Sequence, residues 1–288
     1  MPRVAVVTDS NSGISVEEGR RMGVEVVPMP ILIDGETYYE GVNLTQEAFY
    51  QKQLAGADIA TSQPAPGAVI GAWNRALERC QELVYIPMSA GLSASCSTAR
   101  MLAEPFAGRV EVADNRRISV TQRHAVLDAL ALAQQGLSAA QIRAQLEQAR
   151  DDCCIYLSVD TLRYLRRGGR VSGVEAIAGT MLNIKPVLEI RGEKLTAVGK
   201  VRGMRAAREQ MIQRVRDDLQ GRLKPLWDSG RLQLKLAYSQ VPDQLREDWR
   251  AQVRAAFPQA GELEGEALTL SIACHTGPGA LGIGAVRV

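Results

Sequence analysis

Hydroxyl side chains and one histidine are the residues of this sequence best suited to hold a small anion. Three segments rich in Ser and Thr each end a predicted strand or begin a predicted helix: residues 8–10, 61–64 and 89–95. Ligands of open α/β sheets bind at the carboxyl ends of the strands, so these places favour a binding role. Helix capping explains each segment taken alone. Taken together with His275, they indicate a binding site.

The two histidines differ in their surroundings. His124 lies in a helical pattern beside Val126 and is predicted to be structural. His275 ends an apolar stretch, residues 269–275, that we predict to be a strand, and a glycine-rich turn follows it. That turn, residues 277–282, has the G-x-G-x-x-G spacing, but a strand pattern follows it where a dinucleotide-binding loop needs a helix. We therefore reject nucleotide binding and keep His275 as the functional histidine.

An acyl hydrolase is the alternative from another class. Residues 91–95 resemble a nucleophile elbow, with Ser93 after a strand and before a helix. The order Ser93, then Asp114 or Asp160, then His275 matches that of the α/β-hydrolases. Against this reading, the last glycine of the elbow is replaced by Ser95, and no oxyanion-loop motif is present.

Basic residues gather in the second half of the chain. Residues 160–216 hold thirteen Lys or Arg against five Asp or Glu, although the whole chain carries a net charge of only +2. Within them, residues 166–170 read Arg-Arg-Gly-Gly-Arg, which suits an anion nest of backbone N–H groups. A helix C-cap explains Arg167 and Gly168 without any ligand but does not readily explain Gly169 and Arg170, and a solvated charged face explains the wider region.

Composition excludes several classes of protein. Aromatic residues make up 5% of the chain, which argues against stacking on nucleic acid. The five cysteines include an adjacent pair and no Cys-x-x-Cys, so we expect a reducing compartment and no zinc site. No signal peptide or apolar stretch of about 20 residues is present, so we expect a soluble cytoplasmic protein with no integral membrane segment.

Two α/β domains are predicted to position these residues. Over residues 1–152, buried strand patterns alternate with helices, which predicts a parallel sheet covered on both faces. Over residues 153–288, hairpins mix with helices, which predicts a mixed sheet. A cleft between the domains is the expected ligand site.

These segments resemble the DegV family, which includes the fatty-acid-binding subunits of bacterial fatty acid kinase. The resemblance covers nearly the whole chain, and its most specific element is the Thr-Ser-Gln-Pro of residues 61–64. This chain departs from the family at Asn11, where the family often has Ser or Thr, at Ala94, where it usually has Gly, and in residues 64–66, which lack a common Ser. The other matching segments are residues 7–10, 34–35, Tyr38, 41–42, 49–50, 89–95, 160–170, 182–186 and 275–279.

The resemblance implies a binding subunit that holds one long-chain fatty acid and presents its carboxylate to a partner kinase. ATP would then bind the kinase, and this chain would need no cofactor or metal. The implied carboxylate-binding residues are Thr61, Ser62, Ser93 and His275. The implied supporting residues are Ser95, Gly91, Gly277 and Gly279. Arg170 and Arg202 are the implied contacts of the kinase or the acyl phosphate.

Physical chemistry is consistent with this role. Burying an acyl chain contributes about 0.8 kcal/mol per methylene, which is ample for tight binding. A buried carboxylate needs donors, and hydroxyl groups with one imidazole N–H supply them without a full positive charge. A lipid-sensing module without a kinase is a further alternative. Acyl chain length and oligomeric state are not specified by the sequence.

Overall fold

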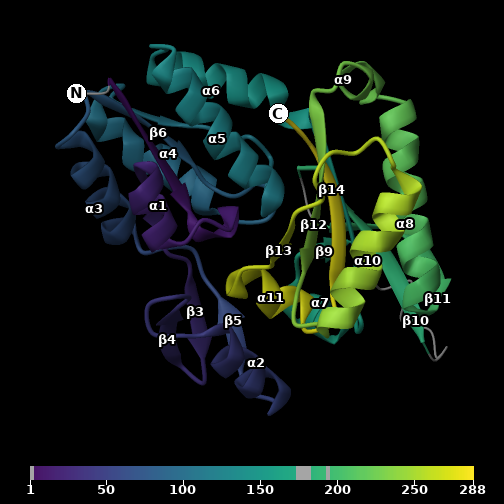
Figure 1. The fold of residues 1–288 in the computed structure, drawn as a ribbon. Coiled ribbons are helices and arrows are strands. Elements are labelled where there is room, and N and C mark those ends of the chain that lie inside the picture. The colour runs from purple at the N-terminus through teal and green to yellow at the C-terminus, as the bar shows by residue number, and fades with distance from the viewer. Residues whose placement is uncertain (1–2, 173–182, 193–194) are drawn as a thin grey trace. The chain divides into compact units, whose positions relative to one another are not determined.

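The computed structural model describes residues 3–172, 183–192 and 195–288. The chain divides into two compact units. Unit 1 comprises Met1–Asp151 and Thr269–Ser271, and unit 2 comprises Asp152–Leu268 and Ile272–Val288 (Figure 1). The α/β fold class is confirmed, with a parallel sheet in the N-terminal part and a separate mixed sheet in the C-terminal part. The predicted domain limits, 1–152 and 153–288, stay a prediction.

Unit 1 is built on a four-stranded parallel sheet in the order β2-β1-β6-β7. The two central strands carry continuous apolar runs, as burial on both faces requires, whereas each of the two edge strands includes a half-buried glutamate. The four strands are β1 (Val4–Asp9), β2 (Val24–Val27), β6 (Glu82–Ile86) and β7 (Val110–Val112). Its helices are α1 (Val16–Met22), α3 (Pro66–Leu77), α4 (Ser95–Ala103), α5 (Val120–Gln134) and α6 (Ala139–Gln148). The 3₁₀ turns are Ser10–Ser12, Glu104–Phe106 and Ala149–Asp151.

Helices cover both faces of this sheet, as predicted. On one face α5 and α6 bury Val126 and Ile142 against β1 and β6. On the other face α3 and α4 bury Trp73 and Cys96 against the same strands. The side chains of each strand alternate between these two cores, so β1 and β6 are packed on both faces up to their carboxyl ends.

A second, smaller sheet in unit 1 carries the Thr61 segment. It is antiparallel in the order β4-β3-β5, from β3 (Pro30–Ile33), β4 (Glu36–Tyr39) and β5 (Ile59–Thr61), with α2 (Gln46–Leu54) between β4 and β5. A hairpin turns at Asp34-Gly35 between β3 and β4, with positive φ angles of 51° and 87° at the two residues. The sheet ends at Thr61, which pairs with Ile31.

Unit 2 is built on a seven-stranded mixed sheet in the order β13-β12-β14-β8-β10-β11-β9. Its strands are β8 (Cys153–Ser158), β9 (Val171–Ser172), β10 (Ile184–Ile190), β11 (Leu195–Arg202), β12 (Leu232–Tyr238), β13 (Gly265–Ala267) and β14 (Leu281–Arg287). Its helices are α7 (Arg163–Gly168), α8 (Gly203–Gln220), α9 (Lys224–Asp228) and α10 (Asp243–Ala256). The main core lies under α8 and α10, where Trp249 is fully buried and donates to the carbonyl oxygen of Gly282 at 3.1 Å.

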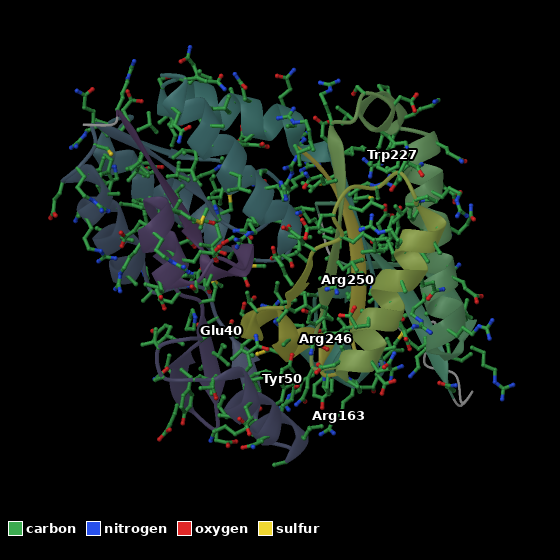
Figure 2. The ribbon with its side chains drawn as sticks, in the orientation of Figure 1. Glu40, Tyr50, Arg163, Trp227, Arg246 and Arg250 are labelled. Atoms are coloured by element: carbon green, nitrogen blue, oxygen red, sulfur yellow. The ribbon has the colours of Figure 1, made fainter. Side chains whose placement is uncertain are left out.

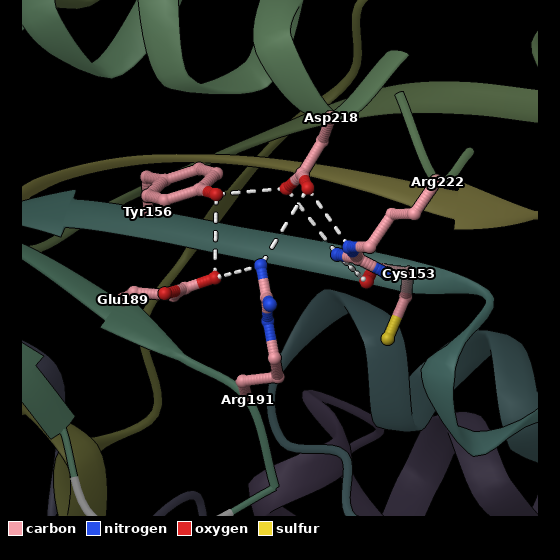
Figure 3. A network of polar contacts seen from close by, with 6 residues as sticks. All are labelled: Cys153, Tyr156, Glu189, Arg191, Asp218 and Arg222. Carbon is pink, nitrogen blue, oxygen red and sulfur yellow. Dashed lines mark hydrogen bonds and ion pairs between the residues drawn. The ribbon is translucent and has the colours of Figure 1, made fainter. Parts of the chain in front are cut away.

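A charged network joins α8 to β8 and β10 (Figure 3). The Tyr156 hydroxyl donates to Asp218 at 2.7 Å, and Arg191 pairs with Glu189 at 2.6 Å. Arg222 donates to the other Asp218 oxygen at 2.8 Å. Two arginines thus meet two carboxylates, so Arg191 and Arg222 are paired within unit 2.

One predicted strand is wrong. A strand was predicted over residues 269–275, but Leu270–Thr276 form a helix, α11. Leu270, Ala273 and Cys274 are buried at helical spacing, and the sequence pattern had suited either structure. His275 therefore lies in the last turn of a short helix.

Candidate functional site

The carboxyl group of Asp9 organises the carboxyl end of the parallel sheet. Asp9 ends β1 and is fully buried. One of its oxygens accepts from the backbone N–H of Met88 at 2.7 Å, just after β6. The other accepts from the N–H of Asn11 at 3.0 Å and from the amide of Gln122 on α5 at 3.1 Å. Asp9 thus fixes two loops and one helix to each other.

Asp9 titrates close to neutrality. Burial raises its pKa to about 6, and the hydrogen bonds from Met88, Gln122 and Asn11 oppose that rise. A carboxylate in this place tolerates burial because N–H donors replace its hydration. The sequence indicated residues 8–10 as a binding segment, but the structure gives Asp9 contacts with its own fold.

Ser93 lies in a loop that turns β6 into α4. Its Oγ lies 2.8 Å from the Oγ of Ser95 and accepts from the backbone N–H of Ser95 at 3.1 Å. The side chain therefore bonds to the first residue of α4 from the position before the N-cap, Ala94, which has no side-chain cap of its own. When Ser95 donates its hydroxyl hydrogen to Ser93, the Ser93 hydrogen is left to donate onward. The backbone N–H of Gly91 bonds to the Ser89 hydroxyl at 3.3 Å, which holds the same loop.

The Thr61 segment reaches the same helix. Thr61 is half-buried at the end of β5, and Ser62 is exposed with its hydroxyl donating to the Gln63 carbonyl oxygen at 3.2 Å. The Gln63 side chain accepts from the Thr98 hydroxyl of α4 at 2.9 Å. Two predicted hydroxyl segments are therefore hydrogen-bonded to α4. Residues 61–63 bond to its side through Gln63, and residues 93–95 lie at its start.

In unit 2, His275 lies against the end of α7. A Cβ placed on Gly168 would be 2.0 Å from Nδ1 of His275, so the imidazole contacts the backbone there and only glycine fits. The next residue, Gly169, has a φ of +66° and its N–H bonds to the Leu165 carbonyl oxygen, as in a helix C-cap. The glycine pair is thus explained by close approach and capping, and the anion-nest hypothesis is wrong for Gly169.

His275 is electrostatically neutral over the physiological range. Burial, and then the positive charge of Arg170, lower its pKa to about 4. Arg170 is itself exposed and donates to the Gly168 carbonyl oxygen at 2.5 Å. A neutral imidazole offers one N–H to a ligand and adds no charge.

The glycine-rich turn after α11 lies against protein side chains. A Cβ on Gly277 would meet the Tyr164 ring at 2.1 Å, and one on Gly279 would meet the Asp160 side chain at 2.8 Å. Asp160 accepts from the buried ammonium of Lys185 at 2.5 Å. The predicted supporting glycines therefore give room to Tyr164 and Asp160.

Arg202 and His124 are the other residues that the sequence analysis singled out. Arg202 is exposed and ends β11, where it pairs with Ile184. His124 is buried in α5, as expected of a structural residue. Within the ranges that the structure describes, no group of three or more His, Cys, Asp or Glu could hold a metal ion. Across the same ranges, no helix is long and apolar enough to span a membrane.

Sequence reasoning missed three polar anchors of the site. Gln122 and Asn11 contact Asp9 from α5 and from the turn after β1, and Glu40 contacts the start of α11. Gln122 lies within a helical pattern and Glu40 in a loop, where surface exposure is the usual state. Asn11 was visible only as a departure from the family pattern.

Comparison with known proteins gives one consistent family. The family described as "Uncharacterised protein, DegV family" matches residues 3–288. A DegV domain-containing protein of Deinococcus radiodurans is 33% identical over 282 residues, which cover 97% of each chain. The structure of a fatty-acid-binding DegV family protein from Thermus thermophilus is similar at 34% identity and a TM-score of 0.86, over 99% of this chain and 100% of that one.

A further solved structure agrees. The fatty acid binding DegV family protein of Streptococcus agalactiae has 26% identity to this chain and a TM-score of 0.83, with 99% of each chain covered.

The low pKa of His275 predicts a pH dependence of stability. The folded pKa of about 4 lies below the reference value of 6.5, so the unfolded chain takes up the proton first as the pH falls. Stability is then lost from about pH 6.5 to about pH 4. At pH 5 we expect this group to cost about 2 kcal/mol of the free energy of unfolding.

Urea unfolding of the wild type and His275→Gln at pH 7 and pH 5 measures this. The variant should lose less stability than the wild type over that interval, and groups common to both, such as Asp9, cancel in the difference. Equal losses in the two proteins, with an imidazole NMR titration midpoint near pH 6.5, would contradict the prediction.

Proposed function

The chain belongs to the DegV family, and from that premise we propose that it binds one long-chain fatty acid and holds it by its carboxylate. The observation that carries the proposal is the likeness, over 99% of this chain, to the fatty-acid-binding protein of Thermus thermophilus. The protein of Streptococcus agalactiae described as fatty acid binding supports the same class of ligand.

The carboxylate is assigned to hydroxyl donors and one imidazole. Ser93 suits this role because it can receive the Ser95 hydrogen and pass its own to a ligand oxygen, which strengthens the second bond. Thr61 and Ser62 follow from their place beside α4. His275 adds a neutral N–H, since burial and the Arg170 charge disfavour its protonation.

Binding by neutral donors suits a carrier. A fully paired buried ion would hold the headgroup by a strong charge interaction, and its desolvation would be costly. Here most of the binding free energy comes from the acyl chain, on the order of 10 kcal/mol gross for a 16-carbon tail. The headgroup contacts then select a carboxylate and orient it.

We further propose that the bound acid is presented to a separate ATP-dependent fatty acid kinase, which forms the acyl phosphate. Support comes from the exposed guanidinium groups of α7 and its flank, where Figure 2 labels Arg163. These groups would meet an acidic partner surface or the phosphate. They are Arg163, Arg166, Arg167 and Arg170. Arg202, exposed at the end of β11, is assigned to the same contact.

Loss of one headgroup donor should weaken binding of fatty acids. For Ser93→Ala we expect the dissociation constant of cis-parinaric acid, a fluorescent 18-carbon fatty acid, to rise by about 10- to 100-fold, the usual cost of a hydrogen bond to a charged group. The measurement is fluorescence titration of lipid-free protein. His275→Gln should act in the same direction.

Ser97→Ala is the matched control, because this exposed serine of α4 donates only to the Ala94 carbonyl oxygen in its own first turn. Equal affinity of Ser93→Ala and the wild type would remove Ser93 from the headgroup site. The same proteins are assayed with p-nitrophenyl palmitate. Turnover by the wild type that is lost in Ser93→Ala would favour the acyl hydrolase instead.

Charge reversal at Arg202 should separate presentation from binding. Arg202→Glu is expected to bind cis-parinaric acid as the wild type does, while phosphorylation of the bound acid by the host's fatty acid kinase falls about tenfold or more at low salt. Arg170→Glu is less informative, since Arg170 also lowers the pKa of His275.

Arg20→Glu, at an exposed position of α1, serves as the charge-reversal control. Full phosphorylation with Arg202→Glu would contradict the docking role of Arg202 and leave fatty-acid binding unaffected.

A further inference from the structure

The first turn of α11, the helix that carries His275, is held by a buried carboxylate. The backbone N–H of Leu270 donates to Glu40 at 2.7 Å, and the other Glu40 oxygen accepts from the Gln46 amide at 2.8 Å. Figure 2 labels Glu40. Burial raises the pKa of Glu40, as expected for a carboxyl group largely removed from water. This contact fixes where the helix begins.

A second anchor lies one residue further along. The Ser271 hydroxyl donates to the side-chain oxygen of Asn11, and both residues are buried, at 6% and 1% exposure. The two residues are 260 positions apart in the sequence. This bond ties the start of α11 to the turn that follows β1.

Asn11 also belongs to the network that holds the Ser93 loop. Its backbone N–H donates to one oxygen of Asp9, and the other oxygen accepts from the N–H of Met88. Its side-chain amide contacts the Met88 sulfur at 3.0 Å. Met88 directly precedes the segment from Ser89 to Ser95.

Ser271 and His275 share one face of α11, because they are four residues apart. The helix is short, so a displacement of its first turn is transmitted to its last turn. His275 has little freedom to compensate, since Gly168 lies directly against its ring. Ser271 and His275 are therefore parts of one short helix, Leu270–Thr276.

We propose that Asn11 is a positioning residue for the ligand carboxylate: through Ser271 it sets the helix that carries His275, and through Asp9 and Met88 it sets the loop that carries Ser93. The inference rests on the proposed function, because it assigns Asn11 a role in that same headgroup site. Asn11 touches neither the ligand nor His275 in this role.

The test compares two ligands that share a tail and differ in headgroup, palmitic acid and 1-hexadecanol. Their dissociation constants are measured by displacement of cis-parinaric acid. For Asn11→Ala and for Ser271→Ala, we expect palmitic acid to bind about tenfold more weakly, the usual effect of one lost hydrogen bond, and hexadecanol to bind within about twofold of the wild type. Ser271→Ala removes the same bond from its other end and serves if Asn11→Ala folds poorly.

Two further variants test the route of the effect. Thr121→Val removes a different buried hydroxyl, which donates to the Ile118 carbonyl oxygen at 2.9 Å, and should change neither dissociation constant. Combining Ser271→Ala with His275→Gln should weaken palmitic acid binding no further than His275→Gln alone, since Ser271 acts through the imidazole.

Equal weakening of both ligands, or additive losses in the double variant, would overturn the positioning role. A wild type that binds hexadecanol and palmitic acid equally would do the same. If the wild type binds neither ligand, the proposed function itself fails, which is a distinguishable result.

Discussion

Removing a carboxyl group from water is the constraint on which the architecture of unit 1 depends. Asp9 ends the first strand in a fully buried position, and three N–H donors from three elements replace its hydration. The cost of burial is evident in its pKa of about 6. Because an unpaired group there would be strongly destabilising, the loop after β6, the turn after β1 and helix α5 are held in one arrangement. The loop that bears Ser93 begins next to Met88, whose N–H bonds to Asp9.

The same physics shapes the chemistry assigned to unit 2. His275 is desolvated and lies beside a positive charge, so it stays neutral and donates a hydrogen without adding charge. The proposed headgroup site, made of hydroxyl groups and a neutral imidazole, would recognise a carboxylate through the directions of the hydrogen bonds that they donate. Arg170, which follows α7, lies near enough to His275 to lower its pKa, and this links the electrostatics of the proposed docking surface to that of the proposed headgroup site.

The sequence predicted those features that depend on local chemistry. The alternation of buried strand patterns with helices predicted the parallel sheet of unit 1 and its cover of helices on both faces. The hydroxyl segments were located because they follow strands. Helix α11 was predicted to be a strand because its buried residues suit either a helical or a strand period. Strand β5 gives a weak sequence signal because it is only three residues long. The bond between Asn11 and Ser271 joins residues 260 positions apart, and its existence depends on the folded chain rather than on either local pattern.

Native mass spectrometry of the purified protein, followed by extraction and identification of any bound lipid, tests the central claim most directly. A carrier that buries an acyl chain releases it slowly, so the account predicts a population of the protein that is heavier by one fatty acid of about 14 to 18 carbons. A protein that carries no lipid, and that gains no such mass after incubation with oleate, would contradict it.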